Sequence, residues 1–269
     1  MDVTSLTLAY FSPTRTTQQV VEGIAAGIQA KSVTRIDLTP PAAEEHGVRT
    51  IVDDLLIIGA PVYGGRIPVP AVSRLQKLKA TNTPAVIVVF YGNRAYEDAL
   101  LELRDLTVAR GFKPVAGGAF IGEHSFHTEA TPIAPERPDA QDLKTAWAFG
   151  ARIRAALEEY GEPRDIPPLQ VPGTSPYKER GHSLEGISPI TMEDHCTLCG
   201  VCVEVCPTAA ITMTPRVMTK PETCIRCCAC VKHCPTHARI MTHPRIKKIA
   251  DWLSTDYRKR REPELYLAS

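Results

Sequence analysis

Apolar residues in the first 160 positions fall into two kinds of run. Runs rich in apolar residues predict five β-strands, at 5–11, 33–38, 54–62, 84–92 and 113–122, of which the first is expected to be buried. Apolar residues at helical spacing predict four helices among these strands, around 20–28 and at 69–80, 96–110 and 139–160. One face of the last helix is expected to carry Leu143, Trp147, Gly150, Ile153 and Leu157.

This alternation of strands and helices indicates βαβ units and therefore a parallel sheet. Five strands within about 150 residues fit a doubly wound α/β sheet in the flavodoxin-like order 2-1-3-4-5. Half of a Rossmann fold is the competing arrangement, but no GxGxxG fingerprint follows the first strand. NAD(P) binding is therefore not expected.

The rest of the chain divides by composition. A proline-rich stretch without periodicity, at 161–187, is expected to be a semi-rigid linker after a first domain at 1–160. All nine cysteines lie further on, and they predict a separate small α+β domain at 188–245. Residues 246–269 are expected to form a C-terminal helix and a tail with a solvated basic stretch at 258–261. A basic docking site for an acidic redox partner is the alternative for this stretch.

The cysteines form two copies of the spacing C-x2-C-x2-C-x3-C-P, in CTLCGVCVEVCP at 196–207 and CIRCCACVKHCP at 224–235. Sequence similarity continues beyond the cysteines, which indicates an internal duplication. This spacing is typical of paired [4Fe–4S] clusters, in which the cysteine before proline reaches across to the other cluster. We expect one cluster on Cys196, Cys199, Cys202 and Cys234, and a second on Cys206, Cys224, Cys227 and Cys230. Zinc is the alternative, but zinc sites favour two separated CxxC pairs.

Cys228 is the ninth cysteine and has no place in either ligand set. We interpret it as a small buried thiol that packs beside a cluster. Arg226 lies inside the second binding loop, whereas Glu193 and Asp194 precede the first. A nearby cation stabilises the more negative, reduced cluster, so the cluster on Cys224 is expected to have the higher reduction potential.

Ligands of a doubly wound sheet bind at the carboxyl ends of its strands. Four segments of the first domain are expected there, at 12–17, 60–68, 91–96 and 122–126. The first offers hydroxyls at a helix N-terminus, which favours an anion, and a simple N-cap by Ser12 or Thr14 is the alternative. Tyr63 and Tyr91 are candidates to contact a flat ring, and ordinary turns are the alternative for both segments. His124 either approaches a ring edge or is structural.

These segments and the paired cysteine motifs resemble the flavodoxin–ferredoxin fusion proteins found mainly in anaerobic bacteria and archaea, over the chain up to about residue 245. The stretches that carry the resemblance are YFSPTRTT, GAPVYGGRIP, YGNRAYEDALLEL and GAFIGEHSF. The resemblance implies an FMN whose phosphate contacts Ser12, Thr14, Thr16 and Thr17. Arg15 stands where the loop of that family usually has glycine, and we expect it to add a charge-assisted hydrogen bond.

The resemblance also implies which residues flank the isoalloxazine ring of FMN. They are Tyr63, Gly64, Gly65, Tyr91, Gly92 and Asn93. Further candidates from the same segments are Pro61, Val62, Arg94 and Tyr96.

A net charge of +1 gives no general attraction to nucleic acid, and no apolar run approaches the ~20 residues of a membrane span. Since the start also lacks the pattern of a signal peptide, we expect a cytoplasmic protein. The expected function is electron transfer between two [4Fe–4S] clusters and FMN, serving redox partner proteins or a small-molecule electron acceptor. Two alternatives stay open: a ferredoxin-type carrier whose first domain binds no flavin and only docks partners, and an FMN-dependent reductase with His124 or Tyr63 as proton donor. The sequence leaves open whether flavin and clusters meet within one chain or across a homodimer.

Overall fold

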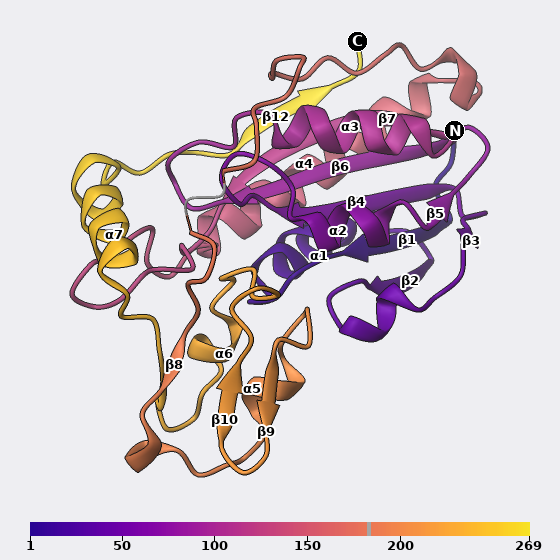
Figure 1. The fold of residues 1–269 in the computed structure, drawn as a ribbon. Coiled ribbons are helices and arrows are strands. Elements are labelled where there is room, and N and C mark those ends of the chain that lie inside the picture. The colour runs from indigo at the N-terminus through magenta and orange to yellow at the C-terminus, as the bar shows by residue number, and fades with distance from the viewer. Residues whose placement is uncertain (182–183) are drawn as a thin grey trace.

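A computed structural model describes residues 1–181 and 184–269. Its centre is a six-stranded sheet in the order β12-β7-β6-β4-β1-β2 (Figure 1). Five of its strands are parallel and match the predicted runs: β1 (Ser5–Tyr10), β2 (Ser32–Asp37), β4 (Leu55–Pro61), β6 (Thr83–Tyr91) and β7 (Phe112–Ile121). Counted along the chain, these five follow the order 2-1-3-4-5, so the flavodoxin-like doubly wound topology is confirmed.

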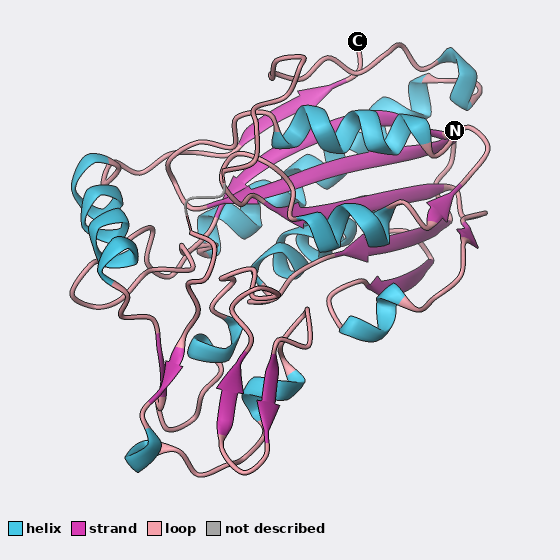
Figure 2. Ribbon diagram, viewed as in Figure 1, coloured by secondary structure: helices cyan, strands magenta, loops and turns pink. Residues whose placement is uncertain are grey.

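Helices cover both faces of this sheet, as Figure 2 shows. α1 (Thr16–Ile28) and α4 (Ala140–Glu159) pack together on one face. α2 (Val69–Leu75) and α3 (Ala99–Ala109) lie on the other face. The predicted helix extended to residue 80. In the structure α2 ends at Leu75, and the following β5 (Leu78–Lys79) pairs with β3 (Arg49–Thr50). Because the sheet is covered on both sides, its inner strands are continuously apolar.

α1 and α4 approach so closely that their crossing requires glycine. A Cβ on Gly27 would lie 1.9 Å from the carbonyl oxygen of Trp147, and one on Gly150 would lie 2.0 Å from that of Ile24. The predicted face of α4 is correct at Gly150, Ile153 and Leu157, which are buried, but wrong at Leu143 and Trp147, which are 37% and 47% exposed. The helices meet through backbone and small residues, so the large side chain of Trp147 points away from the contact.

The cysteine-rich part of the chain forms a small α+β unit beside the carboxyl edge of the large sheet (Figure 1). Its elements are β8 (Ile190–Thr191), α5 (Val201–Glu204), β9 (Ile211–Met213), β10 (Val217–Thr219), α6 (Ala229–Lys232) and β11 (Arg239–Ile240). β9 pairs antiparallel with β10, and β8 with β11. Single 3-10 turns occur at Pro41–Glu44, Pro163–Asp165 and Glu193–His195.

The C-terminal residues return to the first domain. α7 (Pro244–Asp256) is the expected helix, and β12 (Glu264–Leu267) then adds an antiparallel edge strand beside β7, which the sequence analysis did not predict. The expected basic stretch at 258–261 is exposed along its whole length, and the Arg260 guanidinium also donates to the Asp139 carboxylate at 2.6 Å. Within the described residues, no helix has both the length and the apolar character that crossing a bilayer requires.

The proline-rich linker runs over the first domain and packs on it. Ile166 and Leu169 are 1% and 3% exposed and belong to the main core. The Asp98 carboxylate accepts the backbone N–H of Thr174 at 2.8 Å and that of Lys178 at 2.6 Å. These bonds fix the linker up to the point where it reaches the carboxyl edge of the sheet.

Candidate functional site

The predicted sulfur ligands gather in two groups. Cys196, Cys199, Cys202 and Cys234 line one cavity, and Cys206, Cys224, Cys227 and Cys230 line another. Each group combines three cysteines of one motif with the last cysteine of the other, the arrangement expected for paired cubic clusters. Within 1–181 and 184–269, no three His, Cys, Asp or Glu side chains are close enough to share a single metal ion. Ligands of a cubic cluster bind four different irons and therefore stand further apart.

The internal duplication is visible in the backbone of the two cysteine loops. Leu198 and Gly200 have φ values of 55° and 81°, and the equivalent Arg226 and Cys228 both have 57°. Gly200 immediately precedes α5, and Cys228 immediately precedes α6. Cys228 thus occupies a left-handed position that the first motif fills with glycine, where a side chain is strained.

Burial distinguishes the two sulfur groups. Cys199 in the first group is exposed, whereas Cys227 in the second is 7% exposed and its neighbour Cys228 is 2% exposed. Burial raises the pKa of the Cys227 and Cys228 thiols far above their usual range.

A cavity of about 590 Å³ lies at the carboxyl edge of the large sheet. Ten of the predicted site residues line it: Thr14, Thr16, Thr17, Pro61, Val62, Tyr63, Gly64, Tyr91, Gly92 and His124. Further walls come from the linker, at 178–181 and 184–185, and from Ile225 and Arg226 of the second cysteine motif. The sequence analysis missed these walls, because only the packing of the domains brings such distant segments to the cavity.

The segment before α1 both caps the helix and faces the cavity. The hydroxyl oxygens of Thr14 and Thr16 lie 3.2 Å apart, and both residues line the cavity. The Ser12 hydroxyl instead accepts the backbone N–H of Gln18 at 3.1 Å, as a cap does. Arg15 has a φ of 63°, which explains why glycine suits this position. Its side chain is exposed, and Arg15 is not among the residues that line the cavity.

Tyr63 and His124 line the cavity near the second sulfur group. Burial raises the pKa of Tyr63 well above its usual range, and the nearby sulfurs of Cys227 and Cys228 add to the shift. Burial lowers the pKa of His124 to about 4. His124 Nδ1 accepts the backbone N–H of Phe126 at 3.0 Å, which assigns the proton of the neutral ring to Nε2. Both side chains are therefore uncharged at neutral pH.

Asn93 and Tyr96, two other predicted ring contacts, hold the C-terminal segment. The side-chain amide of Asn93 donates to the carbonyl oxygens of Tyr257 at 2.6 Å and Lys259 at 2.9 Å. The Tyr96 hydroxyl donates to Glu264 of β12 at 2.7 Å. These polar side chains therefore have partners away from the cavity.

Gly65 and Arg94 also contact other side chains, both through Glu97. A Cβ on Gly65 would collide with the Glu97 carboxylate, and Arg94 pairs with that carboxylate at 2.8 Å. Lys178 of the linker pairs with Glu97 at 2.7 Å. This cluster holds the linker wall of the cavity in place.

Two polar contacts join the domains near the cavity. Arg74, 3% exposed, donates to the carbonyl oxygen of Pro207 at 2.7 Å. Lys232 of α6 forms an ion pair with Glu123, which itself lines the cavity. Burial is the largest single effect and would raise the pKa of Glu123, but the hydrogen bond and charge of Lys232, with smaller contributions from His127 and the backbone N–H of Glu136, together outweigh it and lower the pKa. The contact thus favours the charged carboxylate.

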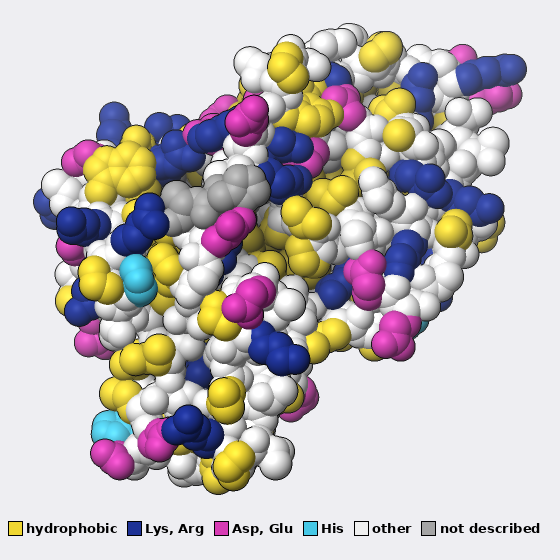
Figure 3. Space-filling view, in the orientation of Figure 1, with side chains coloured by type: hydrophobic (Ala, Val, Ile, Leu, Met, Phe, Trp, Pro, Cys, Tyr) yellow, Lys and Arg dark blue, Asp and Glu magenta, His cyan; other side chains and the backbone are white. Residues whose placement is uncertain are grey.

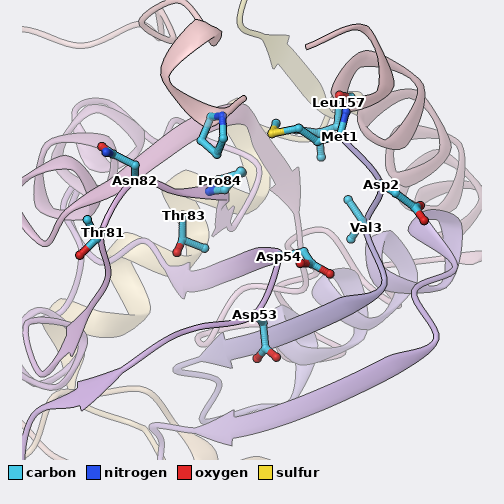
Figure 4. A pocket seen from close by; sticks show the side chains of 11 residues that line it. Met1, Asp2, Val3, Asp53, Asp54, Thr81, Asn82, Thr83, Pro84 and Leu157 are labelled. Atoms are coloured by element: carbon cyan, nitrogen blue, oxygen red, sulfur yellow. Dashed lines mark hydrogen bonds between the residues drawn. The ribbon is translucent and has the colours of Figure 1, made fainter. Parts of the chain in front are cut away.

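A second cavity, of about 280 Å³, lies at the opposite, amino ends of the strands (Figure 4). Asp53 and Asp54 precede β4 at this end, and Asp54 accepts the backbone N–H groups of Thr4 at 2.9 Å and Ser5 at 2.8 Å. The Asp54 carboxylate therefore serves as the hydrogen-bond acceptor for the backbone N–H groups at the start of β1. Ligands of doubly wound sheets bind at the other edge.

Comparison with known protein families finds a match in the cysteine-rich part of the chain. The family described as 4Fe-4S binding domain matches residues 189–212. No curated protein sequence matches the chain.

Three similar solved structures are a flavodiiron core and two flavodoxins. The flavodiiron core from Synechocystis is 22% identical with a TM-score of 0.43, over 59% of this chain and 37% of that chain. A flavodoxin from Archaea is 12% identical with a TM-score of 0.37, over 58% and 99% of the two chains. Flavodoxin 2 from Bacillus cereus is 18% identical with a TM-score of 0.41, over 56% and 99%.

The strand order and the matched cysteine motif together define the architecture. The chain is a fusion of a flavodoxin-like domain and a ferredoxin-like 4Fe-4S binding domain. This architecture suggests electron transfer as the class of function.

Proposed function

We propose that this chain is an electron carrier in which two [4Fe–4S] clusters exchange electrons with FMN. The observation that carries this proposal is the composition of the cavity wall. Ile225 and Arg226 lie between the ligands Cys224 and Cys227, and both line the cavity formed by the loops of the flavodoxin-like domain. A cofactor in that cavity is therefore separated from the second cluster by the thickness of one loop.

The two clusters differ in exposure, and this difference indicates their order in the path of electron transfer. Cys199 of the first group is exposed, and its neighbour Leu198 is 50% exposed. In the second group Cys206, Cys227 and Cys230 are buried, and Ile225 and Arg226 of the same loop line the cavity. Electrons therefore enter or leave at the first cluster and pass through the second.

The lining of the cavity fits FMN at both ends. Thr14, Thr16 and the N-terminus of α1 offer hydroxyl and amide donors to a phosphate. Tyr63 provides a flat surface for a ring, and Gly64 has open space around it, whereas Tyr91 is 2% exposed and packs against Tyr96. Bound FMN accepts one or two electrons, whereas each cluster carries one, so the chain can link one-electron and two-electron partners.

The charge state of the side chains at the cavity favours a carrier over a reductase. A reductase needs a proton donor near the ring, and His124 and Tyr63 were the candidates. With a pKa of about 4, His124 carries no proton to release from an imidazolium at neutral pH. The raised pKa of Tyr63 makes its hydroxyl a weaker acid. Neither side chain is therefore a strong proton donor toward a bound ring.

The basic surface formed by α7 and the segment after it fits an acidic redox protein as the partner. Lys and Arg side chains gather over α7 and the segment after it (Figure 3). Lys247, Lys248, Arg258 and Lys259 are exposed there. Complementary charge accelerates encounter and orients the partners.

Quantification of iron, sulfide and flavin in anaerobically purified protein tests this function. We expect about eight irons and eight sulfides per chain, together with one FMN. Iron without flavin, even after FMN is supplied, supports the carrier whose first domain only docks partners. Rapid steady-state turnover with a small-molecule acceptor and no partner protein supports the reductase.

A further inference from the structure

Arg239 is a buried cation located between the two sulfur groups. It is 2% exposed and lines the cavity of Cys196, Cys199, Cys202 and Cys234. Its Nη2 lies 3.7 Å from the Sγ of Cys230, a ligand of the other group. One guanidinium thus borders both predicted clusters.

Apart from the Cys230 sulfur, the acceptors of Arg239 among the described residues are neutral oxygens. Its guanidinium donates to the Thr191 hydroxyl at 2.6 Å, the Thr219 hydroxyl at 2.7 Å and the Pro189 carbonyl at 3.1 Å. Within the described residues no carboxylate pairs with it, and its buried Nε–H has no partner. A buried charge without a counter-charge strongly destabilises a fold. The site therefore lacks a negative group that the thiolate-bound clusters would supply.

The internal duplication shows that a cation is not required by the fold at this position. CPTAAI in the first motif aligns with CPTHAR in the second, so Arg239 is equivalent to Ile211. Ile211 is 4% exposed and packs in the apolar core around the cysteines. The first half of the repeat therefore has an apolar side chain at this position, and the second half has a permanently charged one.

We propose that Arg239 raises the reduction potentials of both [4Fe–4S] clusters. Reduction adds a negative charge to each cluster, and a guanidinium stays protonated at every relevant pH. Solvent does not screen a charge that is buried between the clusters, so it stabilises the reduced state of each. A hydrogen bond from the free Nε–H to a cluster sulfur would act in the same direction. This inference rests on the proposed pair of clusters.

The test is a redox titration of the holoprotein, followed by EPR, with three variants. Arg239→Gln removes the charge and keeps a hydrogen-bonding side chain, whereas Arg239→Lys keeps the charge. Arg216→Gln is the matched control, because Arg216 lies in the same domain but its side chain is 64% exposed. We expect the reduction equilibrium of both clusters to fall at least tenfold in Arg239→Gln, which is about 59 mV for a one-electron couple. Arg239→Lys and Arg216→Gln should stay near the wild-type potentials.

Iron content separates this inference from the proposed function. Wild-type potentials in an Arg239→Gln protein with full iron would overturn the inference, as would an equal fall in Arg239→Lys. If Arg239→Gln fails to hold its clusters, the Arg239→Lys variant provides the test. Wild-type potentials in Arg239→Lys would support the proposed effect of the positive charge, and a tenfold fall of the reduction equilibrium would contradict it. Iron for only one cluster in the wild type would contradict the proposed function, and the shift at that single cluster would still test Arg239.

Discussion

Single residues that differ between the halves of the cysteine repeat mark where the halves do different chemistry. Cys228 replaces Gly200, and Arg239 replaces Ile211. The spacing of the ligands could be predicted from the sequence because a cubic cluster requires it. The roles of Cys228 and Arg239 could not be predicted, because they depend on the backbone conformation and on which residues surround each group of cysteines.

Cys228→Gly is expected to leave both clusters in place. The left-handed backbone at residue 228 suits glycine, and relief of about 1 kcal/mol of strain offsets the lost packing of a small thiol. Cys227→Ala, one position away, should remove about half of the eight irons expected for two clusters. Iron and sulfide assays on anaerobic protein measure both. If Cys228→Gly also loses half of its iron, Cys228 is a ligand.

Thr16→Val tests the phosphate end of the cavity. The substitution keeps the shape of the side chain and removes the hydroxyl that lies 3.2 Å from that of Thr14. A hydrogen bond to a charged group contributes about 1.5–3 kcal/mol, so FMN should bind at least tenfold more weakly. Riboflavin, which lacks the phosphate, should bind both proteins alike. Titration of FMN into flavin-free protein gives the affinities.

Arg15→Gly is the matched control for this experiment. Glycine suits the φ of 63°, and the Arg15 side chain is exposed outside the cavity, so FMN affinity should stay near the wild-type value. A loss as large as that of Thr16→Val would instead support the arginine–phosphate contact expected from the sequence.

Among the elements, those with an apolar pattern of their own were predicted, and those that depend on a distant neighbour were missed. The inner strands were found because burial on both faces makes them rich in apolar residues, whereas β2 lies at the edge of the sheet and is mostly exposed. β12 has only four residues and follows a basic stretch, so its pairing with β7 has no local signal. The predicted face of α4 was shifted for a similar reason, since Gly27 on another helix decides how α4 packs.

Removal of residues 262–269 should destabilise the flavodoxin-like domain. The deletion uncovers the edge of β7 and removes the partner of Tyr96, whose hydroxyl donates to Glu264. An uncovered, apolar edge strand promotes association between molecules. We expect a lower melting temperature and concentration-dependent light scattering, compared with a control that lacks only Ser269. Unchanged melting without scattering would mean that β12 contributes no stability.

At the scale of the whole molecule, contacts between the two domains hold them in position. The cavity has walls from the flavodoxin-like loops, the linker and the second cysteine motif. The class of each domain could be predicted from motifs within it, but the shared wall could not, because it depends on side chains such as Lys232 and Glu123 meeting across the interface. Electron transfer between the domains should therefore be sensitive to this interface.

Lys232→Met should slow electron transfer between the clusters and FMN while leaving cofactor content unchanged. The substitution breaks the ion pair with Glu123, whose carboxylate the lysine keeps charged. A partly buried pair contributes up to about 1 kcal/mol, which corresponds to roughly fivefold in the docked population. Stopped-flow absorbance after mixing with a one-electron donor should show cluster reduction at the wild-type rate and flavin reduction several-fold slower.

Two further variants distinguish docking from general damage to the ferredoxin-like domain. Arg216→Met breaks an exposed pair with Glu193 in the same domain and should leave both rates unchanged. Exchanging the charges, Lys232→Glu with Glu123→Lys, should recover much of the lost rate, because the attraction across the interface returns. Equal flavin reduction rates in Lys232→Met and wild type would show that the remaining contacts, such as that of Arg74 with Pro207, are sufficient to hold the domains in place.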